Sequence, residues 1–362
     1  MPKQPRVLLI GPELILRWTE STARALESFG CPVKTLLYNS SPVRRGVGGL
    51  RQFLAERAGI RLGEAPPWVQ EGYTRWLQVR RRRAIVRTAR EFRPDLVLVL
   101  KGESMHPATL AKLKASTGAG LAVWWVDHPF MNAETGRRWR YVPDCTPLFD
   151  HCFVFDRSYE ASLREAGARA TSFLPCAADP GIFKPLTLTT VDRRTYGASV
   201  SLVGVYSERR GQVISALCKE PGLGVWGPGW HQFFRTMNGA APQVRGEGLA
   251  PEEVCMVYNA GAVNLNTHHL QSRRGGLNTR SFEIPAAGAF ELTDYVPEME
   301  SLLEPGREVA VYRSPEEAAD LARFYVKAEN QRRRIVEAGY RRVLAEHTYR
   351  HRMETLLEVV AK

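Results

Sequence analysis

The sequence lacks the features that mark membrane and secreted proteins. It has no apolar run near the roughly 18 residues that a membrane-spanning helix needs, and its best runs cover residues 96–100 and 121–126. Residues 1–11 hold only a short apolar stretch, which is too short for the core of a signal peptide and fits a first buried strand. These absences predict a cytoplasmic protein without a transmembrane segment.

Patterns that bind metals or form disulfides are also missing. The six cysteines are scattered without a C-x-x-C pair, so we expect reduced thiols. His268 and His269 are adjacent, so on a strand they would point to opposite faces, and no third ligand lies nearby in the sequence. The sequence therefore predicts no metal site.

Positive charge is in clear excess. The chain of 362 residues has a formal net charge of +12 and otherwise ordinary globular composition, with 44% hydrophobic and 24% charged residues. Such a surface attracts polyanions, although an arginine-rich composition can also serve solubility alone. Charge by itself does not choose between these interpretations.

Strand-like and helical patterns alternate along the whole chain, which predicts the α/β class with parallel sheets. A polar stretch at residues 179–192 is the best candidate for a linker. Strands are expected at residues 6–10, 33–38, 95–100, 121–126, 152–155 and 170–174 before it, and at 199–205, 224–226, 263–265 and 289–292 after it. Ser314 is expected to cap a helix, and the helical pattern then continues to the end with a break near 347–348.

Residues 275–294 form the block that is most informative about function. A glycine-rich loop leads into an expected helix at residues 278–287, and such a loop presents backbone N–H groups that suit phosphate. Arg280 lies in the first turn, where a cation is unfavourable unless an anion is near. Glu283 follows at i+3 on the same helix face. From these residues alone, a phosphate site and an ordinary surface ion pair are both open.

The same block resembles a known family. The runs Asn278–Glu283, 286–290 and 292–295, with further similarity at 201–210, 226–230, 304–306, 314–317 and 347–352, are similar to CgeB-like (spore-maturation type) glycosyltransferases, relatives of the group-1 glycosyltransferases. The resemblance covers residues 150–360. It implies a GT-B fold, in which two Rossmann-like domains face each other across a cleft and a C-terminal helix packs back on the N-terminal domain. The domains would be residues 1–185 for the acceptor, 186–345 for the nucleotide-sugar donor, and 346–362 for the crossing helix.

The resemblance also assigns donor-binding residues. By position Glu283 takes the role of the glutamate that binds the ribose, but the second glutamate of the E-x7-E pair is missing, because Gly275 stands there. Gly204, Arg209 and Arg210 fall in the turn that approaches the diphosphate, with Asn278 and Arg280 beside it. Trp226 would border the base. The two arginines could instead form an ordinary solvated helix start.

In the first half, Asp127 and His128 follow a buried strand and fit the W-x-x-D-x-P pattern of CgeB-like proteins. Either could be the base that deprotonates the acceptor, or Asp127 could merely cap a turn. Lys101, Gly102 and Glu103 are further candidates after a strand. The sequence contains no D-x-D triplet, so we expect transfer without a metal ion and no cofactor besides the nucleotide-sugar substrate.

A stripe of arginines offers a possible partner surface. Arg80, Arg83, Arg87 and Arg90 share one face of the helix expected at residues 73–92. This face could hold a polyanion such as DNA or an anionic surface, and a solvated helix face is the alternative. The functions in contention are a glycosyltransferase with an unidentified acceptor, one that acts on modified DNA or another polyanion, and a sugar-nucleotide-binding protein without catalysis.

Overall fold

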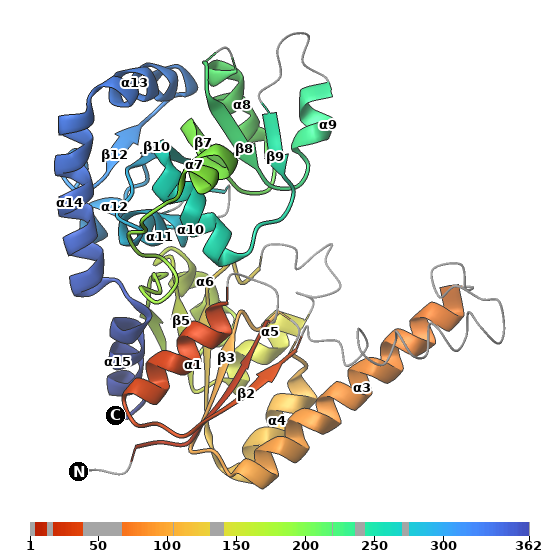
Figure 1. Cartoon of the computed structure of the whole chain (residues 1–362). Coiled ribbons are helices and arrows are strands. Elements are labelled where there is room, and N and C mark those ends of the chain that lie inside the picture. Colours follow the sequence, from red (N-terminus) through yellow and green to blue (C-terminus); the bar gives the residue numbers. More distant parts are fainter. Residues whose placement is uncertain are drawn as a thin grey trace. The chain divides into compact units, whose positions relative to one another are not determined.

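The computed structural model describes residues 4–12, 17–38, 67–103, 105–130, 141–218, 220–235, 243–269 and 275–361. The chain divides into two compact units. The first comprises Met1–Val154, Tyr159–Phe173 and Glu358–Lys362, and the second comprises Phe155–Ser158 and Leu174–Leu357. Each unit contains a six-stranded sheet (Figure 1), so the expected α/β class with two Rossmann-like sheets is confirmed.

The first unit is a parallel sheet in the order β2-β1-β3-β4-β5-β6. Its central strands are short apolar runs that are buried along their whole length, as parallel strands covered on both faces must be. The strands are β1 (Val7–Gly11), β2 (Val33–Leu37), β3 (Leu96–Leu100), β4 (Gly120–Trp125), β5 (His151–Val154) and β6 (Thr171–Phe173). Because β1 pairs with both β2 and β3, the connections after β1 and β3 leave in opposite directions.

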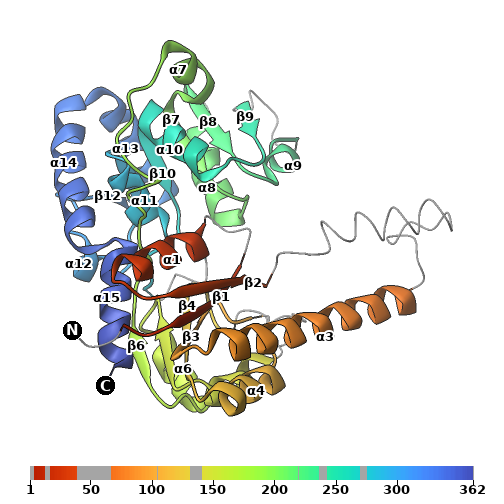
Figure 2. The same ribbon diagram turned by 60° about the horizontal axis from the view of Figure 1, so that its bottom comes forward.

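Helices connect the strands of the first unit. The longest, α3, begins beyond the sheet and ends at Phe92, two residues before Pro94, and both views show it running beside α4 (Figure 2). The helical elements are α1 (Trp18–Ser28), α3 (Pro67–Phe92), α4 (Pro107–Thr117), α5 (Val142–Cys145), the 3-10 turn η2 (Thr146–Leu148) and α6 (Tyr159–Glu165). No helix in the described part of the chain is long and apolar enough to cross a membrane.

The second unit repeats the plan with the strand order β12-β11-β10-β7-β8-β9. Helices α8 and α13 pack together on one face of this sheet, and α7, α10 and α11 lie on the other side. The strands are β7 (Ala198–Val203), β8 (Leu223–Trp226), β9 (Gln243–Gly246), β10 (Gly261–Asn266), β11 (Glu291–Asp294) and β12 (Ala310–Tyr312). The helices are α7 (Thr190–Tyr196), α8 (Glu208–Leu217), α9 (Trp230–Arg235), α10 (Pro251–Ala260), α11 (Arg280–Ala286), α12 (Met299–Leu302), α13 (Pro315–Lys327), α14 (Glu329–Glu346) and α15 (Tyr349–Val360).

The C-terminal helices begin and end near the predicted positions. Ser314 caps α13 by accepting a hydrogen bond from the backbone N–H of Glu317 at 3.1 Å. The break at residues 347–348 separates α14 from α15. There the buried Arg352 donates to the carbonyls of Pro175 and Cys176 at 2.9 Å each, so the start of α15 is tied to the segment that follows β6.

Several elements near the candidate site have bounds that differ from the sequence prediction, and α11 spans Arg280–Ala286 rather than 278–287. Helix α8 begins at Glu208 rather than 211, which places Arg209 and Arg210 in its first turn. An acidic residue at the first position favours this earlier start. Strand β11 spans Glu291–Asp294 rather than 289–292, so Asp294 is the last residue of a buried strand. The short strands β9 and β12 were not predicted, because three or four residues carry too little periodicity.

Candidate donor site at the switch point of the second sheet

The strand order of the second sheet indicates where a ligand is expected to bind. Strand β7 pairs with β8 on one side and with β10 on the other, so the chain changes direction between β7 and β10. Ligands of open α/β sheets bind at such a switch point, beyond the carboxyl ends of the strands. Gly204 directly follows β7, while Thr267 and His268 directly follow β10.

Gly204 lies beside two guanidinium groups, and its lack of a side chain leaves room for them. A Cβ at this position would lie 2.9 Å from Nη2 of Arg280 and 3.0 Å from Nη1 of Arg210. The neighbouring turn is equally close, since a Cβ on Gly227, whose φ is +135°, would lie 2.1 Å from the carbonyl oxygen of Gly204. Because neither glycine has a Cβ, the backbone at Gly227 can approach that of Gly204, and the guanidiniums of Arg210 and Arg280 can lie beside Gly204.

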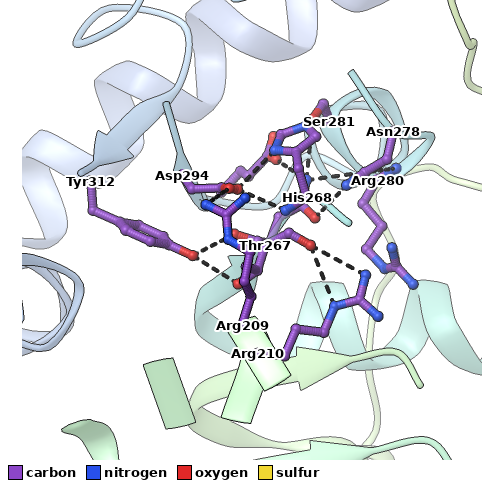
Figure 3. A network of polar contacts seen from close by, with 11 residues as sticks. Arg209, Arg210, Thr267, His268, Asn278, Arg280, Ser281, Asp294 and Tyr312 are labelled. Carbon is purple, nitrogen blue, oxygen red and sulfur yellow. Dashed lines mark hydrogen bonds and ion pairs between the residues drawn. The ribbon is translucent and has the colours of Figure 1, made fainter. Parts of the chain in front are cut away.

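Backbone carbonyls hold both arginines in place, and Figure 3 shows the bonds from Arg210 to the carbonyl of Thr267. Arg210 donates from Nη1 to the carbonyl of Val205 at 2.8 Å and from Nε and Nη2 to that of Thr267 at 3.3 and 3.2 Å. Arg280 donates from Nε to the carbonyl of Val203 at 2.8 Å. All three acceptors lie at the ends of β7 and β10, so the folding of these strands orients the guanidiniums.

The pair of cations creates a strongly positive point. Arg210 is only 7% exposed, and its burial, followed by the charge of Arg280, lowers its pKa. Carbonyl oxygens satisfy its N–H groups without neutralising the charge. An anion bound between the two guanidiniums would relieve their repulsion, and Arg matches the geometry of phosphate oxygens.

Arg209 contacts a second group of polar residues. Its Nη2 lies 3.0 Å from Oδ2 of Asp294, whose Oδ1 accepts from the backbone N–H and from Nδ1 of His268, both at 2.8 Å. Burial alone would raise the pKa of Asp294, but His268 and Arg209 bring it below its ordinary value. The ionised carboxylate accepts the proton that His268 carries on Nδ1, and Nε2 of the same ring lies 3.4 Å from the Ser281 hydroxyl.

An amide network joins β10 to the start of α11. Asn266 and Asn278 exchange hydrogen bonds of 2.9 and 3.1 Å, and Asn278 Oδ1 also accepts from the backbone N–H of Arg280 at 2.9 Å. Asn266 further donates to Oε1 of Glu291 at 2.8 Å. Burial raises the pKa of Glu291 to about 8. This network sets the position at which α11, and with it Arg280, begins.

Glu283 lies buried on α11. It is 3% exposed, and this burial raises its pKa to about 7, although the charge of Arg280 and a hydrogen bond from Thr279 favour the ionised form. The i,i+3 relation to Arg280 thus places the two charges within electrostatic reach of each other, as the sequence predicted. A surface ion pair is not what the structure shows, because the carboxylate is inside the unit.

Trp226 is also inside the second unit. As the last residue of β8 it is 2% exposed, and the guanidinium of Arg245 lies 5.5 Å from its ring centroid. Gly224 makes room for the ring, since a Cβ there would lie 2.7 Å from it. In this conformation the indole supports the turn after β8 and offers no open face.

The predicted residues of the first unit form a separate group. Asp127 follows β4 and lies 2.5 Å from Nζ of Lys101. His128 accepts at Nδ1 from the backbone N–H of Phe130 at 3.0 Å, and its ring lies 4.3 Å from that of Tyr159. Neutral His128 therefore carries its proton on Nε2. In this conformation Asp127 offers a proton acceptor and His128 offers a donor.

The arginine stripe lies on α3. The side chains of Arg80, Arg83, Arg87 and Arg90 are all exposed. The guanidinium of Arg80 lies 4.7 Å from the ring centroid of Trp76, which is 47% exposed. This exposure is consistent with the expectation that the four arginines lie on one face of the helix.

Several residues of the second site were not singled out as binding residues by the sequence. Asn264 and Asn266 alternate in an otherwise apolar strand, so both point to the same face, and that period of two was the available signal for Asn266. Asp294 and Tyr312 carry no such signal, because only the pairing of β11 and β12 brings them to the switch point. Among the described residues no group of three His, Cys, Asp or Glu side chains could hold a metal ion.

Comparison with known proteins agrees with this geometry. Residues 209–358 match the sequence profile of a family described as glycosyl transferase-like. Spore protein CgeB of Bacillus subtilis (strain 168) is 20% identical over 272 residues, which cover 71% of this chain and 80% of CgeB. The matched residues 209–358 include β10, α11, β11 and all but the first residue of α8, the elements that carry the arginine pair and its supporting network.

Solved structures share the fold across the whole chain. Anabaena HepE in complex with UDP and glucose superposes with a TM-score of 0.63 and 12% identity, covering 99% of both chains. An alpha-glucosyltransferase in complex with UDP and a 13-mer DNA containing an HMU base gives a TM-score of 0.63 and 11% identity, covering 99% of this chain and 100% of that one. The solved structures share the GT-B fold with this chain, and residues 209–358 form a domain of the glycosyl transferase-like family. The chain as a whole is a distant homologue of CgeB.

Proposed function

We propose that the chain transfers a sugar from a nucleoside diphosphate sugar to an acceptor hydroxyl. The observation that carries this proposal is the pair of guanidiniums from Arg210 and Arg280 at Gly204, at the switch point of the second sheet. A diphosphate supplies the anion that this pair lacks. HepE binds UDP and glucose on the same fold, so UDP and UDP-glucose are the first donors to test.

The predicted donor residues other than the buried Trp226 have a place in this proposal. Arg280 and Arg210 contact the diphosphate, and Arg209 can turn from Asp294 towards it, since its side chain is 30% exposed. Asn278 holds the backbone of Arg280. Glu283 accepts hydrogen bonds from the ribose hydroxyls in its ionised form.

The reaction breaks the bond between the anomeric carbon and the diphosphate oxygen and forms one to the acceptor oxygen. The acceptor hydroxyl loses its proton, and we assign Asp127 as the base in preference to His128, whose Nδ1 is already an acceptor for Phe130. The arginines stabilise the negative charge of the leaving diphosphate. We therefore propose that transfer needs no metal ion, as the lack of a D-x-D triplet also suggests.

Isothermal titration with UDP, ADP, GDP and their glucose derivatives tests the donor site. We expect one of these diphosphates to bind, and Arg280→Ala and Glu283→Ala to weaken it by about tenfold or more. Arg323→Ala is the matched control, because Arg323 lies 47% exposed on α13 of the same unit. If no diphosphate binds, or if both site variants bind as the wild type does, the donor site is wrongly assigned.

Transfer itself needs a second measurement. Release of free nucleoside diphosphate with an acceptor library should continue in EDTA, and a requirement for Mg²⁺ or Mn²⁺ would contradict the metal-free proposal. Diphosphate binding without hydrolysis or transfer in any screen would instead favour the sugar-nucleotide-binding protein that the missing glutamate at Gly275 leaves open.

A polyanionic acceptor such as modified DNA is the second candidate function. The exposed arginines of α3 and the DNA complex of the alpha-glucosyltransferase of the same fold support it. Binding to duplex or single-stranded DNA should weaken steeply as salt rises and lose about one unit of salt slope for each arginine neutralised in Arg83→Ala and Arg87→Ala. Lack of DNA binding at low salt would remove this candidate.

A further inference from the structure

The second unit has an open pocket that the proposed transfer reaction does not use. Its volume is about 470 Å³, and the described residues that line it are Arg194, Thr195, Val244 and Arg245. The first two lie in the last turn of α7, and the other two lie on β9, the edge strand of the second sheet. None of these residues belongs to the candidate donor site.

The contact that Arg245 makes separates this pocket from the donor site. Nη1 of Arg245 donates to the carbonyl of Gly197, the residue just before β7, whereas Gly204 directly follows β7. A strand of this length spans roughly 20 Å. The guanidinium of Arg245 therefore lies at the amino end of β7, and the arginine pair of the donor site lies at its carboxyl end.

Arg245 is held in place but keeps an unused donor. Besides its bond to Gly197, its guanidinium lies 5.5 Å from the ring centroid of the buried Trp226. Its Nε is buried and has no hydrogen-bond partner among the described residues. A buried N–H without an acceptor costs about 1–3 kcal/mol, so an acceptor bound in the pocket would stabilise this side chain.

The pocket carries positive charge. Arg194 and Arg245 are the charged side chains among the described lining residues, and none of those residues is acidic. The undescribed residues of the second unit add no negative charge either, because their charged members are all cations, namely Lys219, Arg273 and Arg274.

Carboxylates on the neighbouring elements contact other groups. Asp192 accepts from the hydroxyl of the N-cap residue of α7 at 2.7 Å, and Glu253 of α10 accepts from the Tyr196 hydroxyl at 3.1 Å. Glu247, which follows β9, lies 4.0 Å from Nε2 of His231. The two guanidiniums of the pocket are thus left for an anion from solution.

A phosphate group matches this charge. A phosphate monoester carries about −1.5 to −2 charges at pH 7, close to the two positive charges of the pocket, whereas a carboxylate brings only one. The planar guanidinium also presents its N–H groups in the geometry of phosphate oxygens. Pockets for small molecules measure about 300–1,000 Å³, so this pocket has room for a small molecule that carries the phosphate.

We propose that the pocket formed by α7 and β9 binds the phosphate group of a small phosphate monoester through Arg194 and Arg245. This site is separate from the donor site and does not depend on the proposed transferase function. Binding of phosphate only at the pair formed by Arg210 and Arg280 is the opposing outcome.

Titration with three matched compounds tests the class of ligand. Glycerol 3-phosphate, glycerate and glycerol are titrated separately into the wild type by calorimetry, in about 0.15 M NaCl so that weak surface attraction is screened. We expect glycerol 3-phosphate to bind at least about tenfold more tightly than glycerate, and glycerol not to bind. Absence of binding, or equal affinity for glycerol 3-phosphate and glycerate, overturns the proposal.

Substitutions of arginine locate the bound phosphate. Arg194→Gln should weaken the binding of glycerol 3-phosphate about tenfold. Arg193→Gln is the matched control, because Arg193 is exposed on the same helix without lining the pocket, and it should bind as the wild type does. Arg280→Ala should also leave this affinity unchanged. If Arg280→Ala abolishes binding and Arg194→Gln does not, the phosphate binds at the donor site and the proposal is wrong.

Thr195→Glu tests the pocket while Arg245 and its contacts stay intact. Thr195 is exposed on α7, so we expect the variant to unfold at nearly the temperature of the wild type. The new carboxylate competes with the ligand for the guanidiniums, and binding of glycerol 3-phosphate should be lost. Unchanged affinity in this variant contradicts the proposal. A wild type that binds glycerol 3-phosphate as expected but no nucleoside diphosphate would contradict the proposed function and support this site.

Discussion

At the residue level the second unit concentrates cations where strands of the sheet end. Arg209, Arg210 and Arg280 come from two helices, and backbone carbonyls and Asp294 set their orientation (Figure 3). Because carbonyls orient a guanidinium without cancelling its charge, the site is prepared for an anion before one binds. Such preorganisation reduces the cost of ordering side chains on binding.

Gly204→Ala tests how closely the two guanidiniums approach. The new Cβ would lie within 3.0 Å of atoms at the far ends of Arg210 and Arg280, so the side chains shift while the backbone stays. Gly204 also has φ +158°, where an alanine is strained, so we expect UDP affinity to fall about tenfold and the free energy of unfolding to fall by about 1–3 kcal/mol. Calorimetric titration and thermal unfolding measure both. Gly248→Ala, which meets nothing within 4 Å, is the control and should match the wild type.

The buried carboxyl of Glu283 should make stability depend on pH. Its pKa is raised by burial to about 7, so the folded state holds this proton more tightly than the unfolded state does. The protonated carboxyl of Glu283 adds about 3 kcal/mol to the free energy of unfolding relative to the ionised form. This contribution is present in full below about pH 4.5 and is lost as the pH rises through 7.

Glu283→Gln removes this titration. Urea unfolding at pH 5 and pH 8 should show that the wild type loses more stability than the variant over this interval, by about 2–3 kcal/mol. Glu337→Gln, on the exposed face of α14, serves as control and should follow the wild type. Equal pH dependence of the wild type and Glu283→Gln would show that Glu283 is ionised at little cost in the folded protein.

At the level of elements, one buried arginine, Arg352, holds the start of α15 in place. Besides Pro175 and Cys176, Arg352 donates to the carbonyl of Glu346 at 2.9 Å and lies 2.9 Å from Nδ1 of His347. Nε2 of His347 lies 2.8 Å from the carbonyl of Leu302, so Nε2 carries the proton and Nδ1 accepts from Arg352. Burial, followed by the charge of Arg352, lowers the pKa of His347 to about 3.

Arg352→Lys keeps the charge and loses the planar fork that reaches several carbonyls. We expect it to reduce the free energy of unfolding by about 2–4 kcal/mol, because buried acceptors lose their donors. Denaturant unfolding is the measurement. The side chain of Arg341 on α14 is 71% exposed, so Arg341→Lys should reduce the free energy of unfolding by less than about 0.5 kcal/mol. Similar costs for the two variants would show that the network adds nothing beyond a surface arginine.

For the whole molecule, two compact units predict two responses to ligand. A nucleotide that binds only to the second unit stabilises that unit, by about 2.7 kcal/mol at a hundredfold excess over Kd. Scanning calorimetry with UDP should therefore shift the transition of the second unit, and Arg280→Ala should abolish the shift. An equal shift of every transition would show that the units unfold together or that both bind the nucleotide.

The fold class and most of the parallel strands of each sheet were predictable from the sequence. Runs such as VLLIG and LVLVL are buried on both faces and can only be central parallel strands. Ser314 and the break at residues 347–348 marked helix ends through local capping chemistry, which needs no distant contact. Helix α8 began earlier than expected and β11 later, because short-range patterns fix element ends poorly.

The sequence by itself determined the α/β class, the two sheets and the block around Asn278–Glu283 as the candidate donor site. Only the tertiary structure decided that Arg210 and Arg280 meet over Gly204, that Asp294 holds Arg209, and that Glu283 and Trp226 are buried. Strand patterns arise from neighbours in the chain, so they can be read locally. A convergence of side chains from β7, β10 and α11 depends on strand order, which local sequence does not encode.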